Sequence, residues 1–175
     1  MGEFIEVRTN VGADASQLAL ELVNGNNGSV YNTLVIADAT KVSDGTFDYY
    51  VFNLPANGLQ NGSPDGIALS NDGALIEFVS YEGSFSAADG IAAGVTSTDI
   101  GVAESGSTAI GQSLQRLDGD VWDSPRAETK GADNTPPPMP TLISAIQGDG
   151  DESPLLGSVV TVSAVVTATV NNGFF

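Results

Sequence analysis

Apolar and polar side chains alternate along several short segments of this chain. In residues 17–23, Leu18, Leu20 and Leu22 fall on one face of an extended backbone. The same strand character recurs in further segments, namely residues 47–54, 66–70 and 74–81. Turn sequences separate these segments: NGNNGS at 24–29, SDG at 43–45, NGSPDG at 61–66 and NDG at 71–73. NDG predicts a tight hairpin, and short strands at such spacing predict an all-β sandwich or barrel.

The second half of the chain continues this β pattern after a long connection. Residues 84–111 are rich in Gly, Ala, Ser and Thr, which fits either a functional surface loop or a well-packed connection over one end of the sandwich. Residues 112–117 and 121–122 return to strand character. Trp122 is the only tryptophan, and we expect it to fill the core beside the closing strand.

Proline marks a boundary between two domains. Five of the eight prolines lie between Asp123 and Pro140, and Pro136-Pro137-Pro138 favours an extended spacer. The sequence therefore predicts a β-sandwich over residues 1–123, a Pro-rich linker over 124–140 and a second β segment over 141–175. That last segment begins with TLISAIQ and ends with GSVVTVSAVVTATV. It holds too few strands for an independent domain.

Composition excludes several kinds of chemistry. The 175 residues include 22 acidic and 5 basic side chains, a net charge of −17, with no His and no Cys. Imidazole bases, thiolate nucleophiles and His/Cys zinc sites are therefore excluded. The charge argues against direct binding of nucleic acid, and no apolar run is long enough to span a membrane. The opening residues lack the basic and apolar regions of a signal peptide, so if the parent is secreted, this chain either starts after a removed signal or is an excised piece.

Two acidic turns are candidate calcium sites. Asp118, Asp120 and Asp123 have a D-x-D-x-x-D spacing that could surround a hard cation with oxygen ligands. Asp149 and Asp151, followed by Glu152, form a second acidic turn without the full EF-hand pattern. Asp99 and Glu104 are a third possibility. Solvated hairpin turns explain the same residues, so we expect that no cofactor is required and that Ca²⁺ is a possible ligand.

Several strings resemble a known domain family, in the family's order. They are GEFIEV (2–7), LVNGNNGSVYNT (22–33), NGLQNGSPDGIAL (57–69), FVSYEGSFSAADG (78–90), TSTDIGVAESGST (96–108), GQSLQRL (111–117) and KGADN (130–134). Over about residues 2–134 the chain resembles the bacterial lamin tail domain, an immunoglobulin-like β-sandwich. Residues 145–168, followed by NGFF, are similar to the opening of the OB-fold module of bacterial extracellular nucleases.

The resemblance implies an accessory role. In those nucleases a lamin tail domain, an OB-fold module and a metal-dependent endonuclease/exonuclease/phosphatase domain follow one another. The chain is then a non-catalytic, extracellular or cell-surface bacterial module, an immunoglobulin-like sandwich plus a truncated OB-fold β-hairpin. Its partner would be the downstream nuclease domain. Because the family's catalytic domain uses His and this chain has none, no catalytic residue is carried over.

A different class of function remains open, namely a structural cell-surface or filament subunit that assembles by β-strand pairing. Family members usually carry a strand before GEFIEV, so the edge at Glu3 to Val7 would be open to another chain. We expect the Val/Thr-rich run from Gly157 to Val170 to form a strand on that edge, in the same chain or in a neighbouring copy.

Overall fold

The chain folds into two compact units. The computed structural model describes residues 2–134, 141–162, 169–170 and 173–174. One unit is Met1–Asn134 and the other is Thr135–Phe175. Strand β10 (Val121–Ala127) continues past residue 124, where the sequence predicts the linker to begin. The boundary placed between 123 and 124 is therefore wrong, because it falls inside a strand.

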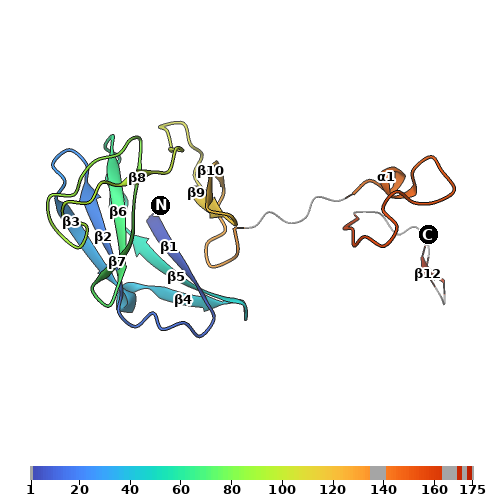
Figure 1. Ribbon diagram of the computed structural model, residues 1–175, viewed down its shortest axis with the longest axis horizontal. Helices are drawn as coiled ribbons and strands as arrows, with labels where there is room; N and C mark the ends of the chain where they lie inside the picture. The colour runs from blue at the N-terminus through green and yellow to red at the C-terminus, as the bar shows by residue number, and fades with distance from the viewer. Residues whose placement is uncertain (1, 135–140, 163–168, 171–172, 175) are drawn as a thin grey trace. The chain divides into compact units, whose positions relative to one another are not determined.

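A five-stranded sheet forms one layer of the first unit. Its strands are β2 (Leu18–Asn24), β3 (Val30–Val35), β6 (Asp65–Asn71), β7 (Ala74–Tyr81) and β8 (Thr98–Asp99). The order across the sheet is β3-β2-β6-β7-β8, and Figure 1 shows these strands side by side. All neighbours are antiparallel except β7 and β8. The predicted hairpin at NDG is confirmed, since Asp72 and Gly73 both have positive φ between paired strands β6 and β7.

A three-stranded sheet forms the facing layer. It contains β1 (Glu3–Asn10), β4 (Thr40–Ser43) and β5 (Phe47–Leu54) in the order β1-β5-β4, all antiparallel. A short 3-10 helix, η1 (Ile36–Asp38), connects β3 to β4. Strand β5 lies in the middle of this sheet, and its FDYYVFNL sequence is buried at six of eight positions. Among the described strands, β1 pairs with β5 alone.

The main core lies between the two sheets. Leu18, Leu20 and Leu22 of β2 pack in one cluster with Phe52 and Leu54 of β5. The alternation expected in residues 17–23 is thus confirmed, because these three leucines are at most 5% exposed. The first unit is therefore all-β and sandwich-like, with its apolar faces turned toward each other.

The outer face of the five-stranded sheet is covered by the first half of the long connection. Ala87 and Ala92 pack against Ala68 and Phe78, which point away from the main core. Phe85 adds an edge-on contact with Phe78, at 5.3 Å between ring centroids. For residues 84–97 the structure therefore favours a well-packed connection over an open surface loop.

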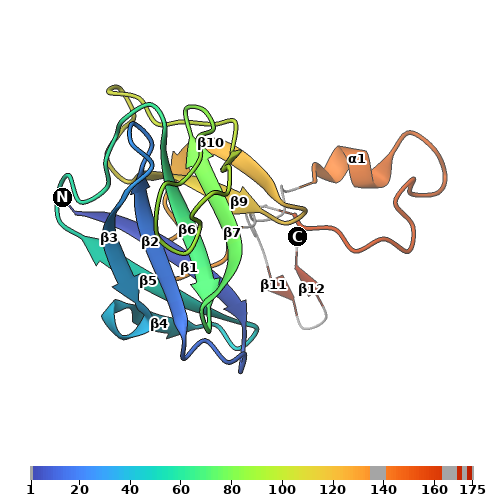
Figure 2. The ribbon, with the colours of Figure 1, turned by 60° about the vertical axis from the view of Figure 1, so that its left-hand side comes forward.

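The last two strands of the first unit form a hairpin of their own. Strand β9 (Gln112–Leu117) pairs antiparallel with β10, with an irregularity between Asp123 and Arg126. The two views of the ribbon place this hairpin beside the sandwich rather than within either sheet (Figures 1 and 2). Trp122 is only half-buried and is not part of the core. The prediction that it fills the core is wrong, because its strand never joins a sheet layer.

The second unit differs from the expected β segment. TLISAIQ was expected as a strand but contains the helix α1 (Ile143–Gln147). Leu142, Ile143 and Ile146 have the three- and four-residue spacing of one helical turn, and Gly148 ends the helix with a φ of +64°. Neither described helix is long and apolar enough to cross a membrane.

The predicted C-terminal strand is in part wrong. Residues 157–162 are not in a strand, and residues 163–168 lie outside the described residues. Beyond them, β11 (Thr169–Val170) pairs with β12 (Gly173–Phe174). The pairing of this run with Glu3 to Val7 stays a prediction.

Candidate functional site

The first candidate calcium site does not converge in the fold. Each of its three carboxylates forms an ion pair with a different arginine, at 3.1 Å in every case: Asp118 with Arg8, Asp120 with Arg116 and Asp123 with Arg126. An arginine guanidinium beside a carboxylate occupies the oxygen lone pairs that a cation would need. Asp118 links the hairpin to β1 through Arg8, whereas the ion pairs of Asp120 and Asp123 lie within the hairpin.

The other acidic candidates are also separate from one another. Asp149, Asp151 and Glu152 are exposed in the second unit. Asp99 accepts the backbone N–H of Gly101 at 3.0 Å. Burial raises the pKa of Glu104, and the nearby Glu3 carboxylate adds to the effect. No group of three or more acidic side chains in the described ranges is placed to hold a metal ion, and calcium binding stays a prediction.

The most deeply buried carboxylates are used to hold the backbone. Asp65, which is 2% exposed, accepts the N–H groups of Gly25 at 3.0 Å and Gly62 at 2.6 Å. Asp48 is paired with Lys41 at 2.8 Å, and that ammonium group holds the pKa of the Asp48 carboxyl below its usual value. Their positions in strands are therefore explained by stability rather than by chemistry on a substrate.

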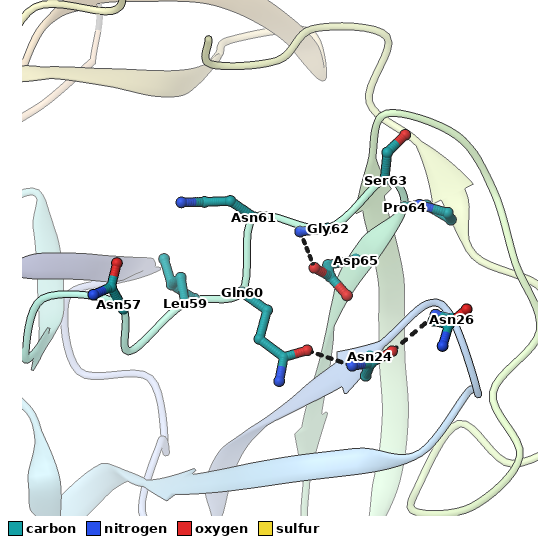
Figure 3. Close-up of a pocket in the computed structure, with 10 residues that line it drawn as sticks. All are labelled: Asn24, Asn26, Asn57, Leu59, Gln60, Asn61, Gly62, Ser63, Pro64 and Asp65. Atoms are coloured by element: carbon teal, nitrogen blue, oxygen red, sulfur yellow. Dashed lines mark hydrogen bonds between the residues drawn. The ribbon is translucent and has the colours of Figure 1, made fainter. Parts of the chain in front are cut away.

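A polar depression of about 430 Å³ lies above Asp65, beside the loop that precedes β6 (Figure 3). Its lining is rich in amide side chains: Asn24, Asn26, Asn57, Leu59, Gln60, Asn61, Gly62, Ser63, Pro64 and Asp65. Asn24 and Gln60 face each other and are joined by a 2.6 Å hydrogen bond, and Asn24 also accepts the N–H of Asn26. Two of the five amide side chains are therefore bonded to each other, and they brace the loop before β6 against β2.

The loop at the depression is anchored to the sandwich from both sheets. Glu3 of β1 accepts the backbone N–H groups of Asn57 and Leu59. The hydroxyl of Tyr31 accepts the N–H of Gln60, and the hydroxyl of Tyr81 donates to its carbonyl. Burial raises the pKa of both tyrosines, so each hydroxyl keeps its proton at neutral pH.

A second, larger cavity of about 800 Å³ lies between the sandwich and the β9–β10 hairpin. We call it the interstrand slot. Residues 4–8 of β1 line one wall, and residues 113–120 of β9 and its turn line the other. The floor is the inner face of the five-stranded sheet, with Leu20, Ile67, Leu69 and Val79. This volume falls within the ordinary range of roughly 300–1,000 Å³ for ligand pockets.

Some polar atoms of the residues that line the slot lack a hydrogen-bond partner. Gln115 is 3% exposed, and its side-chain amide nitrogen, Nε2, donates to the carbonyl of Ala127 at 2.7 Å. Its Oε1, and the Nε of Arg116, are buried without a hydrogen-bond partner in the described part of the chain. Trp122 also lines the slot. A buried polar atom without a partner is uncommon in a native fold and calls for an explanation.

Polar contacts hold the hairpin and the segment after it against the sandwich. Arg116 reaches both carboxylate oxygens of Glu77 on β7, at 2.8 and 3.0 Å. Glu6 of β1 accepts the N–H of Gly131 at 2.6 Å, and partial burial raises its pKa. Lys130 lies over the ring of Phe4, at 4.8 Å from its centroid. The outer wall of the slot is thus attached by charged groups rather than by a sheet ladder.

Sequence reasoning named none of the unsatisfied groups of the slot. Gln115 and Arg116 lie in a segment identified only as a strand, and nothing local distinguishes them from exposed strand residues. The one available signal was the expectation of an open edge at Glu3 to Val7, because Phe4 to Val7 belong to the facing wall. No family model, no curated protein and no solved structure matches the chain.

Proposed function

We propose that this chain is a non-catalytic interaction module, with an immunoglobulin-like sandwich, at the N-terminal side of a secreted bacterial nuclease. The observation that carries this proposal is the ordered series of strings that resemble a lamin tail domain and then an OB-fold module. The parent enzyme would be of the endonuclease/exonuclease/phosphatase type and would act outside the cell or at its surface. The downstream nuclease domain would then be the immediate partner of the module.

The use of the buried carboxylates supports a binding role rather than a catalytic one. Asp65 is occupied by two backbone N–H groups and Asp48 by an ammonium group. A general acid or base needs a carboxyl that can reach a substrate proton. The interstrand slot, by contrast, combines an apolar floor with charged and polar side chains around it, as a binding cavity can.

An immunoblot combined with an in-gel DNA assay tests this proposal. Antibodies raised against the purified chain are applied to the culture medium and to the cells of the source bacterium. We expect a secreted band heavier than the 175-residue chain. It should comigrate with divalent-metal-dependent degradation of DNA cast in the gel. A band confined to the cell interior, or a secreted band that never coincides with DNA degradation, would contradict the proposal.

A structural subunit that assembles by strand pairing is the second candidate. It is favoured by β1, an eight-residue strand at the end of its sheet, with β5 as its partner among the described residues. An edge strand presents unpaired N–H and C=O groups that can template another chain. Sedimentation of the purified chain over a hundredfold concentration range distinguishes the two functions. A filament subunit is expected to form concentration-dependent polymers, whereas an accessory module should stay a single species.

A further inference from the structure

We propose that the interstrand slot binds an extended peptide segment of another polypeptide, which adds as a β-strand between β1 and β9. The partner would carry apolar side chains at alternate positions and at least one basic residue. This inference rests on the proposed interaction-module function and names the kind of partner that the module would recognise.

The two walls present backbone edges to the cavity. On β1 the lining residues are consecutive, from Phe4 to Arg8, and on the hairpin they run consecutively from Ser113 to Asp120. Side chains of a strand alternate between its two faces, so a cavity that meets successive residues faces the strand edge. An inserted strand could therefore pair with β1 and β9 and join the three-stranded sheet to the hairpin. Five residues of β1 correspond to about 17 Å of extended peptide.

The floor of the slot is formed by side chains on one face of strands β6 and β7. Ile67 and Leu69 of β6 line it at alternate positions, as do Glu77 and Val79 of β7. All four are only partly buried, although the leucines of β2 on the same face of the sheet are buried. Every second side chain of an inserted strand would pack on this apolar floor, which sets the alternation expected of the partner.

The unsatisfied polar atoms supply a further argument. Gln115 Oε1 needs a donor and Arg116 Nε needs an acceptor, and both residues line the slot. A peptide backbone offers an N–H donor and a C=O acceptor at each residue. Both atoms are closed to solvent in the free chain, so a bound strand would satisfy them once these two side chains turn toward it, whereas a purely hydrocarbon ligand could satisfy neither.

Charge favours a basic partner. The residues that line the slot include six carboxylates and three basic side chains. Arg8 and Arg116 are paired with three of these acids, Asp118, Glu77 and Asp120, which leaves Glu6, Glu82 and Glu104 beside one further base, Lys130. The whole chain carries a net charge of −17. Lysine or arginine at the ends of the peptide would relieve this excess and speed association.

Synthetic peptides added to the full-length chain test the proposal. The probes are eight-residue peptides Lys-X-Thr-X-Thr-X-Thr-Lys with X as Val, Ile, Leu or Phe, and the matched controls replace the central Thr by Pro. Binding is followed by the fluorescence of Trp122, the only tryptophan, which lines the slot. We expect at least one probe to bind at least tenfold tighter than its control, because Pro removes a main-chain donor. Hydrogen exchange should slow at those amides of residues 4–8 that point away from β5.

Two substitutions on β7 locate the binding. Val79→Glu places a charge on the slot floor and should weaken binding at least tenfold, whereas Ile76→Glu, at a 59% exposed position of the same strand, should leave it unchanged. If Val79→Glu does not fold, Leu114→Glu on the opposite wall takes its place. The exchange measurement on the unaltered chain depends on neither variant.

Several results would overturn the proposal. One is the absence of saturable binding by every probe up to about 1 mM, a concentration that detects even an interaction of about 4 kcal/mol. Another is protection confined to β3 or β8 instead of β1. A third is slow hydrogen exchange at the outer edge of β1 in the chain without peptide, together with a dimer in sedimentation. That result would mean that a second copy of the chain occupies the slot. The in-gel DNA assay is independent of these measurements, so the two proposals can fail separately.

Discussion

Replacing Asp65 by Asn should destabilise the first unit strongly. Asp65 is 2% exposed, and its two carboxylate oxygens each accept one backbone N–H, from Gly25 and Gly62. An amide keeps one acceptor but turns an NH₂ group toward the other N–H. Loss of one charge-assisted bond and burial of an unpaired donor together cost about 3 kcal/mol. For a chain of this size that corresponds to a fall in Tm of about 10 °C.

Urea unfolding followed by Trp122 fluorescence and by circular dichroism measures this change. Asp72→Asn is the matched control, because Asp72 is exposed in the β6–β7 turn, where its φ of +49° suits Asn. We expect the control to change the free energy of unfolding by less than about 0.5 kcal/mol. A loss below about 1 kcal/mol in Asp65→Asn would refute the reasoning, since the carboxylate would then not hold the loop.

Further predictions concern Glu6, Arg116 and the behaviour of the chain toward DNA. Burial raises the pKa of Glu6, so the folded state favours its neutral form, and the related stability is present at low pH and lost as the pH rises through that pKa. Glu6→Gln should therefore raise the free energy of unfolding at pH 7, by less than about 1 kcal/mol because Glu6 is only partly buried, and leave it unchanged near pH 3.5; urea unfolding at the two pH values measures both. Arg116→Met should speed hydrogen exchange in β9 and β10 about tenfold while β2 and β5 stay protected, because its ion pair with Glu77 holds the hairpin; equal exchange in both variants would contradict that role. The purified chain should leave plasmid DNA intact with Mg²⁺, Mn²⁺ or Ca²⁺ and bind DNA more weakly than micromolar near 150 mM salt, and cleavage that is lost with an acidic residue would contradict this.

The strands of the sandwich could be predicted where one face is apolar and the turn is distinctive. Residues 47–54 and 74–81 match β5 and β7 at both ends, because β-rich composition and the NDG turn point to the same structure. Strand β4 was missed, since TKVS is exposed at all four positions and has no apolar alternation to reveal it. Its place is determined by pairing with β5, which is a tertiary contact.

The candidate site was less accessible to sequence reasoning. Acid spacing in the DGDVWD turn suggested a cation site, but the sequence does not reveal that three arginines from different segments reach those acids. The slot depends on where a hairpin lies relative to β1, more than a hundred residues earlier. In the second unit, TLISAIQ fits both periodicities over so few residues that pattern alone could not decide between strand and helix.

A protease should cleave the two halves of the long connection after β7 to very different extents. In the first half, Ser97 donates to Ser80 at 2.7 Å, and Ala87 and Ala92 are at most 3% exposed. The second half, from Gly101 to Gly111, holds Ile110 at 78% exposure and is tied mainly by hydrogen bonds within itself. A protease must draw roughly ten residues into its cleft in extended form, so cleavage should concentrate at Gly101–Gly111 and spare residues 84–97. An affinity tag or reporter domain could then be inserted between Gly106 and Ser107 with the sandwich intact.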